Sequence, residues 1–334
     1  MGKRAFIDDT VDKDDHAQRQ FVNEAYVVGW ICALDTDYVA AQVFLDEKHA
    51  PPVSVATNDN NDYTLGRIGK HNVVIAVLPG GEYGTAAAAT VARDMLHSFT
   101  KVRIGLMVGV GGGAPNARND IRLGDVVVSV PQNGLGGVLQ YDFGKEIQDQ
   151  PFHVTRFLAP PPPVLLMAVS GLRAAYRING HYIQKDIQAR LAEHERLRKE
   201  FDRPDAATDR LYRSHVIHPV RDGDCMDNCG TDEALVIQRL ARDDDDDPTV
   251  HYGLIASANR LMKNAKLRDQ YANERNILCF EMEAGGLSNH FPCLVIRGIC
   301  NYADTHKNKK WQGYAAMTAT AYAKDVLNMI PANK

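Results

Sequence analysis

The sequence predicts an α/β protein in which helices cover both faces of a central sheet. Short apolar runs, typical of strands buried on both faces, alternate along the chain with segments of helical spacing. Polar and flexible residues fall repeatedly where the apolar runs end, and sheets of this class bind ligands at the carboxyl ends of their strands. These two patterns indicate the fold class and place the expected site at one edge of the sheet.

The expected elements alternate in chain order. Strands are expected at residues 24–34, 63–79, 102–110, 124–130, 249–259 and 291–300, and a polar turn at 69–72 makes the second run a hairpin. Helices are expected at 37–49, at the Ala-rich segment 84–99, which begins at a Gly-Thr cap, and at the amphipathic segment 311–330. Residues 279–290 predict a strand that turns into a helix.

Length and composition fit one large globular domain. The chain has 334 residues, 45% of them hydrophobic and 24% charged, which is enough to bury a sizeable core. We expect residues 1–22 to form a flexible, solvated arm and residues 23–334 a single domain. Residues 145–250 contain a Pro run, a charged helical stretch at 187–201 and an acidic run at 243–247, so we interpret them as an elaboration on the core.

Composition argues against several classes of partner. A net charge of −4 gives no general attraction to nucleic acid or to an anionic membrane. There is no run of about 18 apolar residues, no signal-peptide core near the start, and Phe6 occupies the position where a myristoylation signal needs Ser or Thr. Six cysteines are too few for a disulfide scaffold in this length, so reduced thiols and a cytoplasmic location are expected.

Polar and glycine-rich segments at the ends of the expected strands are the candidate site residues. They are Asp35 and Asp37, residues 79–85, residues 109–115, Asn259, Glu281 and Glu283, and Asn301 and Asp304. Four glycines in the first five positions of 109–115 suit either a backbone cradle for an anion or sugar, or a tight structural turn. The segment lacks the Lys-Ser/Thr of a P-loop and does not match the dinucleotide fingerprint.

Glu281 and Glu283 flank Met282 with a period of two, so on an extended segment both carboxylates point to one face. A carboxylate there can hold the vicinal diol of ribose. Equally, two acids can decorate a helix N-terminus, where the dipole favours them.

Cys225 and Cys229, with His215 and His218 nearby, have a spacing compatible with zinc. No second Cys pair supports a metal, so structural or free thiols are favoured and no metal is expected. The basic segment 305–310 is expected to be a solvated loop, or a phosphate contact if it lies beside the site.

Five ordered motifs together resemble the nucleoside phosphorylase/nucleosidase superfamily. They are GWICALDTDYVAAQ, PGGEYGTAAAA, VGVGGGAP followed by IRLGDVVVS, CFEMEAGGL and VIRGICNYAD. Phrases such as ARDMLHSF and HYGLIASAN look like the phosphorylase-like domain of fungal NOD-like receptors and related ATP or adenosine nucleosidases. The resemblance covers residues 25–330 and implies a central mixed, partly closed β-sheet flanked by helices, and cleavage of the N-glycosidic bond of a nucleoside.

The resemblance implies roles for individual residues. Asp37 stands where nucleosidases carry the Glu that orients the attacking water, Glu283 where the ribose hydroxyls are held, and Asn301 where an Asp protonates the purine N7. These three are the expected catalytic residues. The expected substrate-binding residues are Leu34, Gly84, Val110, Gly111, Asn259, Phe280, Met282, Asp304, Arg203, Arg210 and Lys307.

Two departures from the family pattern bear on the reaction. The arginines with which phosphorylases bind phosphate are missing, and negative Asp35 and Asp37 would repel a dianion, which favours water as the nucleophile. Asn301 has no acidic proton to give, and general acid catalysis is worth about 10²–10⁴-fold. Hydrogen bonds alone could stabilise the leaving purine, Asp304 could replace the acid, or the chain could be an inactive variant.

The sequence therefore predicts an N-ribosyl hydrolase acting on purine nucleosides or nucleotides, with adenine as the base and ATP as one candidate. Arg203, Arg210 and Lys307 would then meet the phosphates. The alternatives are a non-catalytic adenine-nucleotide sensor, an interaction domain, and a phosphorolytic purine nucleoside phosphorylase. No cofactor is required, and the resemblance implies a homo-oligomer, with a dimer expected.

Overall fold

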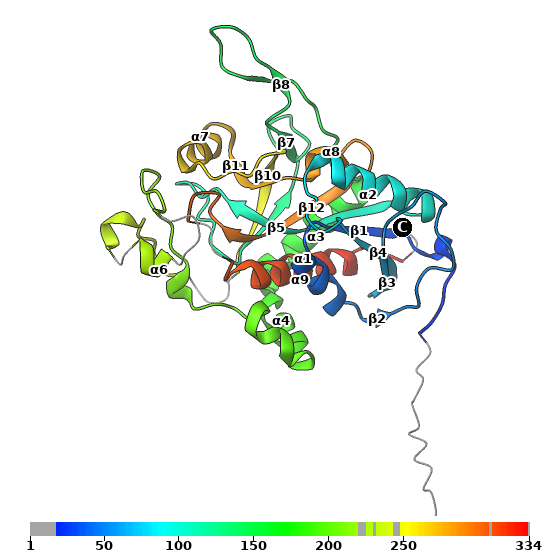
Figure 1. Cartoon of the computed structure of the whole chain (residues 1–334). Helices are drawn as coiled ribbons and strands as arrows, with labels where there is room; N and C mark the ends of the chain where they lie inside the picture. The colour runs from blue at the N-terminus through cyan, green and yellow to red at the C-terminus, as the bar shows by residue number, and fades with distance from the viewer. Residues whose placement is uncertain (1–17, 220–224, 230–231, 243–247, 307–308, 333–334) are drawn as a thin grey trace, which may run out of the picture.

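A mixed β-sheet forms the centre of the molecule (Figure 1). The computed structural model describes residues 18–219, 225–229, 232–242, 248–306 and 309–332. In this part of the chain the main sheet has the order β11-β10-β6-β12-β5-β1-β4-β3-β2, and β7 pairs with β10. Its strands are β1 (Val28–Cys32), β2 (Glu47–Lys48), β3 (Tyr63–Ile68), β4 (His71–Val77), β5 (Ile104–Gly113), β6 (Val126–Ser129), β7 (Val138–Gln140), β10 (Val250–Ser257), β11 (Ile277–Glu281) and β12 (Cys293–Asn301).

The sheet closes on itself over half of its width. Strand β11 pairs in parallel with β10 and antiparallel with β5, so β11, β10, β6, β12 and β5 form a ring, while β1 to β4 extend from it as an open edge. Parallel pairs join β5 to β1 and β12, and antiparallel pairs join β12 to β6 and β3 to β4. The expectation of a mixed, partly closed sheet is confirmed.

Helices cover the sheet from both sides, as the sequence predicted (Figure 1). Helices α2 (Thr85–Ser98) and α8 (Ala284–Leu287) contact each other on one side, and α1 (Asp35–Val43) and α9 (Gln312–Asn328) pack together on the other. Helix α9 lies against β12 and β5 and is almost entirely buried. A Cβ at Gly298 of β12 would lie 1.8 Å from the carbonyl oxygen of Ala315, so this glycine allows the close approach of the helix.

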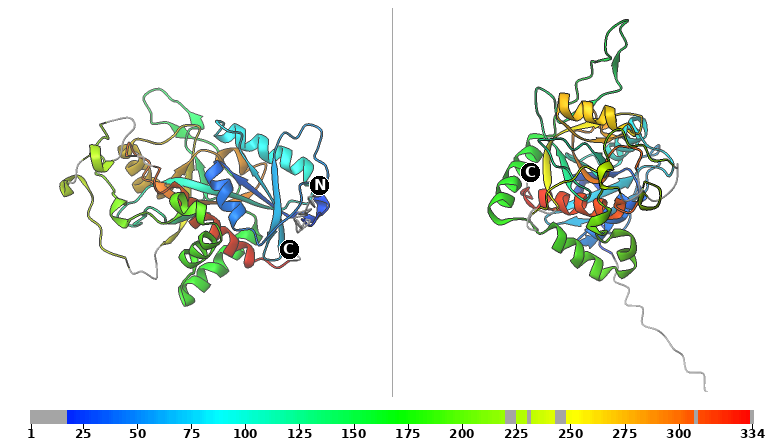
Figure 2. Two further views of the ribbon diagram at one scale, coloured as in Figure 1. Left: turned by 60° about the horizontal axis from the view of Figure 1, so that its bottom comes forward. Right: turned by 90° about the vertical axis from the view of Figure 1, so that its left-hand side faces the viewer.

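The region expected as an elaboration contains several short elements. They are the hairpin of β8 (Gly144–Lys145) and β9 (His153–Val154), α3 (Pro163–Asn179), α4 (Ile183–Glu193), α5 (Arg198–Phe201) and α6 (Cys225–Asn228), while α7 (Ala265–Arg275) follows β10. Figure 2 shows the β8–β9 hairpin standing away from the body. Helix α3, which begins within the Pro run, was not among the predicted helices. Pro163 stands at its first position, where a missing N–H costs nothing.

The described start of the chain packs against the domain. The Phe21 ring lies 4.6 Å from that of His49, and the Ala50 N–H donates to the Arg19 carbonyl. Residues 1–17 of the expected arm and the acidic run 243–247 lie outside the described residues. Among the described helices none is both long and apolar enough to span a membrane.

Candidate active site

A cavity of about 320 Å³ opens where several core strands end, and we call it the strand-end cavity. Its volume lies at the lower end of the usual range for small-molecule sites. It brings together the three expected catalytic residues from three distant segments. Its lining residues are Ala33, Leu34, Asp37, Tyr83, Val110, Gly111, Gly112, Arg260, Leu261, Met262, Phe280, Glu281, Met282, Glu283, Cys300, Asn301 and Ala303.

Asp37 lies in the first turn of α1 with a buried side chain. Its Oδ2 accepts a hydrogen bond from the Leu34 N–H at 3.2 Å, whereas its Oδ1 is buried without a hydrogen-bond partner among the described residues. Burial raises the pKa of Asp37 to about 7, although the Arg297 guanidinium acts in the opposite direction. A carboxyl with an unused oxygen and a pKa near neutrality is suited to accept a proton from a water molecule.

Arg297, in the middle of β12, was not expected at the site and is completely buried. Its Nη2 donates to Glu281 and, at 3.0 Å, to Glu283, and its Nη1 donates to the Val110 carbonyl at 3.4 Å. The sequence analysis treated it as part of an apolar strand. An arginine in a strand buried on both faces is itself a signal, because a buried guanidinium needs carboxylate partners.

Glu281 and Glu283 both pair with the guanidinium of Arg297. Their carboxylates therefore point to the same side of the chain, as their spacing of two residues predicted. Glu281 Oε2 also accepts from the N–H groups of Glu283 and Ala284, at 3.1 and 3.0 Å, and thus fixes the turn after β11. Burial raises the pKa of Glu283, and the adjacent Glu281 carboxylate adds to this while Arg297 opposes it. Glu281 therefore anchors the turn through its Oε2, while its Oε1 is buried without a described partner. Both Glu281 and Glu283 line the strand-end cavity.

The glycine run is the end of strand β5, so the alternative of a tight turn is wrong. The other alternative, a backbone cradle for a ligand, stays a prediction, and Gly111 and Gly112 line the strand-end cavity. None of the residues Gly109–Gly113 adopts a positive φ. A Cβ at Gly109 would lie 2.4 Å from Asp37 Oδ2 and 2.9 Å from Arg297 Nη1. The glycines are thus needed because larger residues would displace the site's side chains from the strand.

Asn301 is the last residue of β12 and lines the strand-end cavity. Its Oδ1 accepts a hydrogen bond from the Ala303 N–H at 2.9 Å, and its Nδ2 lies 3.2 Å from the Cys300 sulfur. This arrangement assigns the amide orientation, because an N–H at Ala303 needs the oxygen as acceptor. The NH₂ group is then the end of Asn301 that a ligand in the cavity can meet.

Asp304 does not line the strand-end cavity, so it cannot replace the missing acid there. It is buried on the other side of the connection after β12, where it pairs with Arg268 at 3.4 Å and accepts from the His306 N–H at 2.9 Å. The left-handed conformation of Ala303, with φ of 51°, turns the chain between Asn301 and Asp304 and separates the two side chains.

Gly84 and Asn259 were expected to bind substrate, but in the structure they stabilise the start of helix α2. Asn259 Oδ1 accepts from the Thr85 N–H and hydroxyl, both at 2.9 Å, and so caps the start of α2. Gly84 has a φ of +97°, and a Cβ there would lie 2.8 Å from the same Oδ1. Neither residue lines the strand-end cavity.

Arg203 and Arg210, expected to meet phosphates, line a different cavity of about 450 Å³. The reason is that their segment folds against Leu123 and Trp311, away from the strand-end cavity. Lys307 lies outside the described residues. Arg260 does line the strand-end cavity, although no role was predicted for it, and its guanidinium lies 5.2 Å from the centre of the Tyr141 ring.

No protein-family model matches the chain, but solved structures share its fold. The 5′-methylthioadenosine/S-adenosylhomocysteine nucleosidase of Neisseria meningitidis, in complex with methylthio-immucillin-A, gives a TM-score of 0.55 at 14% identity, covering 90% of this chain and 98% of that one. The futalosine hydrolase of Helicobacter pylori gives 0.54 at 14% identity, covering 91% and 98%. The chain therefore has the nucleosidase fold, and the predicted resemblance is confirmed at that level.

One curated protein is similar in sequence to this chain over most of the chain's length. A nucleotide-binding leucine-rich repeat (NLR)-like protein of Hyaloscypha variabilis is 47% identical over 307 residues, which is 92% of this chain and 30% of that protein. The chain thus spans less than a third of this relative's length. The likeness to fungal NOD-like receptors that the sequence motifs predicted is borne out by this match.

Proposed function

We propose that the protein is an N-ribosyl hydrolase that splits the N-glycosidic bond of purine nucleosides, with adenine as the favoured base. The observation that carries the proposal is the meeting of Asp37, Glu283 and Asn301 in one cavity. The nucleosidase fold supports it, since a solved structure of that fold holds a methylthio-immucillin. The reaction forms a bond from water oxygen to the anomeric carbon and breaks the bond from that carbon to the base nitrogen.

In this reaction Asp37 takes the proton of the attacking water. Its buried Oδ1 has no other described partner, and the pKa of about 7 leaves a large ionised fraction at neutral pH. Glu283, held at its Oε2 by Arg297, accepts hydrogen bonds from the ribose diol. Asn301 donates an N–H to N7 of the leaving purine, which is an acceptor, but it transfers no proton. The departing adenine anion takes its proton from solvent water, and Asp37 returns the proton of the attacking water to solvent, so that adenine and ribose are the only products.

Water is favoured over phosphate by the charges around the cavity. The three carboxyls of Asp37, Glu281 and Glu283 outnumber the two guanidinium groups nearby. One is Arg260, which lines the cavity, and the other is Arg297, whose described hydrogen bonds go to two of these carboxyls and to a carbonyl. A phosphate dianion placed there would meet like charges in a site of low dielectric. The sequence analysis overlooked Arg297, yet its conclusion on phosphate is supported, because this arginine is already engaged.

A nucleoside without a long 5′-phosphate chain fits the cavity better than ATP does. Of the described residues that line it, Arg260 alone is an arginine or lysine. A triphosphate carries about 3–4 negative charges and needs several cationic or N–H donors. We therefore rank adenosine and related 5′-substituted nucleosides ahead of AMP, and AMP ahead of ATP.

The test is chromatography of the products after incubation of the protein with adenosine, 5′-methylthioadenosine, AMP and ATP, each with and without phosphate. The proposal expects free adenine and free ribose from adenosine without any need for phosphate. Ribose 1-phosphate, formed only when phosphate is present, would establish phosphorolysis instead. Cleavage of ATP with adenosine left intact would keep the reaction but reverse the proposed order of substrates.

A second candidate is a non-catalytic adenine-nucleoside sensor, and Asn301 favours it. This residue cannot act as an acid, and its oxygen is already held by the Ala303 N–H. The NLR-like relative adds support. Calorimetric binding of adenosine without any adenine release would favour this candidate.

A further inference from the structure

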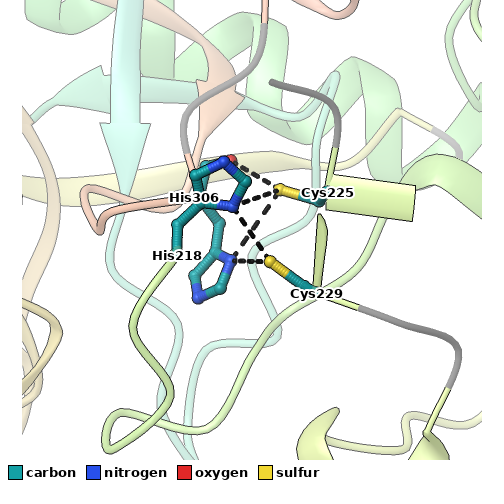
Figure 3. Close-up of side chains that lie close together, drawn as sticks. All are labelled: His218, Cys225, Cys229 and His306. Carbon is teal, nitrogen blue, oxygen red and sulfur yellow. Dashed lines mark hydrogen bonds between the residues drawn. The ribbon is translucent and has the colours of Figure 1, made fainter. Parts of the chain in front are cut away.

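Four side chains that can bind a metal lie close together outside the strand-end cavity (Figure 3). They are His218, Cys225, Cys229 and His306, and their nitrogen and sulfur atoms all lie within 4.8 Å of one another. Cys225 is the first residue of helix α6 and Cys229 follows its last residue, whereas His306 comes from the connection between β12 and α9. The sequence analysis considered the cysteines with His215 and His218. No metal was expected because no second Cys pair supports one, and His306, which lies far along the chain in a basic segment, was not considered as a ligand.

The distances suit a tetrahedral ion of the size of zinc. Zinc lies about 2.3 Å from sulfur and 2.0–2.1 Å from nitrogen, so the sulfur–nitrogen edge of its tetrahedron is about 3.6 Å. Three of the four sulfur–nitrogen pairs are near this value: Cys225 to His218 at 3.7 Å, Cys225 to His306 at 3.8 Å, and Cys229 to His306 at 3.4 Å. The fourth, Cys229 to His218, is shorter at 2.9 Å and would have to widen around an ion.

The surroundings of His306 prepare its Nδ1 as a ligand. Its Nε2 lies 3.1 Å from the Val216 carbonyl, which can only accept, so the proton of a neutral ring sits on Nε2 and the lone pair on Nδ1 faces the thiols. A carbonyl on the second ring nitrogen is the usual partner of a metal-binding histidine. The Tyr212 ring stacks on this imidazole, with centroids 3.9 Å apart, and holds its plane.

We propose that these residues form a structural zinc site with two thiolate and two imidazole ligands. Four protein ligands fill a tetrahedron and leave no position for a substrate or a reactive water, which is the property of structural rather than catalytic zinc. The mixed sulfur and nitrogen set selects zinc over magnesium or calcium, which prefer oxygen.

The zinc site would link His218, Cys225 and Cys229 of the elaboration to the connection after β12, the strand that ends at Asn301. Buried Tyr212, Cys225 and Val236 form a small apolar cluster, and the partly buried side chains of Val216, Cys229 and Leu235 pack against it. Such a small cluster gives little stabilisation by itself, and metals commonly stabilise units of this kind. Through His306 the ion would tie this cluster to the connection after β12, where the His218 N–H also donates to the Thr305 hydroxyl at 2.9 Å.

The experiment is elemental analysis of the whole chain, purified without a metal-affinity tag. We expect about one zinc per chain, the stoichiometry of a single four-ligand site. His218→Ala and Cys229→Ser should lose the metal, whereas His215→Ala, a matched change at an exposed neighbouring histidine, should keep it. If the variants fold poorly, cobalt-substituted wild-type protein gives an independent readout, since tetrahedral cobalt with thiolate ligands has intense visible absorption.

Chelation of the wild-type zinc should lower the melting temperature by several degrees, and added zinc should restore it. The proposal is overturned if the protein contains no zinc and zinc does not raise its melting temperature. It is equally overturned if mass spectrometry finds a Cys225–Cys229 disulfide in freshly purified protein, or if His218→Ala and Cys229→Ser retain the full zinc content.

Discussion

At the scale of single residues, the proposed chemistry of the strand-end cavity depends on Asp37. Its carboxyl is buried, one oxygen has no described partner, and burial raises its pKa to about 7. The same burial that suits it to accept a proton makes its ionised form unfavourable. A residue that serves as a base in this way should therefore reduce the stability of the folded chain at the pH where it works.

The pH dependence of stability tests this property of Asp37. Between about pH 4 and 7 the folded protein retains a proton that the unfolded chain releases. Asp37 therefore lowers the unfolding free energy as pH rises through this window, by about 1.4 kcal/mol per pH unit. Asp37→Asn should be more stable than wild type above pH ~7 and similar near pH ~4. Urea unfolding at both pH values measures the difference, and equal curves at high pH would contradict the shift.

The Asn301→Asp variant distinguishes an enzyme that is slow because it lacks a general acid from a non-catalytic sensor. One carboxylate oxygen can accept the Ala303 N–H as the amide oxygen does, and the other can carry a proton to the purine. Adenine release should rise by about 10²–10⁴-fold, the usual contribution of a general acid. Adenosine affinity measured by calorimetry serves as the control, and unchanged turnover with intact binding would point to a sensor.

At the scale of elements, Arg297 joins β12 to the turn after β11. Arg297→Met leaves the Glu281 and Glu283 carboxyls buried without their partner and should cost about 3–5 kcal/mol of unfolding free energy. Arg93→Met is the matched control, because Arg93 pairs with Asp94 but is 59% exposed, and it should cost less than about 1 kcal/mol.

A second change checks the cause of that loss. Adding Glu281→Gln to Arg297→Met removes one unpaired charge and should recover part of the stability. If Arg297→Met and Arg93→Met lost the same unfolding free energy, the buried network of Arg297, Glu281 and Glu283 would stabilise the protein no more than an exposed ion pair does.

The packing of α9 on β12 depends on Gly298. A Cβ there would lie 1.8 Å from the Ala315 carbonyl oxygen, so Gly298→Ala must displace the helix and should cost at least about 1–3 kcal/mol. Gly80→Ala is the control, because nothing lies within 4 Å of a Cβ at that position. Thermal unfolding should show a clear drop for the first variant and none for the second; a wild-type melting temperature for Gly298→Ala would contradict the observed packing.

The sequence predicted most of the core elements and three residues that line the candidate site, because apolar runs and the polar residues after them are local signals. Asp37, Glu283 and Asn301 each follow an expected strand, and they do meet in one cavity. Arg203 and Arg210 failed as site residues because their position depends on how an irregular segment folds back, and no local pattern encodes that. His306 was missed for the same reason, since its cysteine partners lie in a different segment.

At the scale of the whole molecule, the partly closed sheet gathers segments from both ends of the chain at one edge. The nucleosidase fold and the NLR-like relative fit either a free enzyme or one part of a longer protein. The resemblance also implies a homo-oligomer, and we expect a dimer. Sedimentation velocity at micromolar concentration should show a single dimeric species, and a pure monomer would contradict this expectation.

The most direct test of the central claim compares wild type with Asp37→Asn in phosphate-free buffer, with adenosine as substrate and free adenine as the measured product. If Asp37 is the general base, wild type releases adenine and free ribose at a rate that rises with pH to a plateau above about pH 7. The rate of Asp37→Asn should then be lower by at least about 10²-fold. Adenine release that is equal in both proteins, or that requires phosphate, would contradict it.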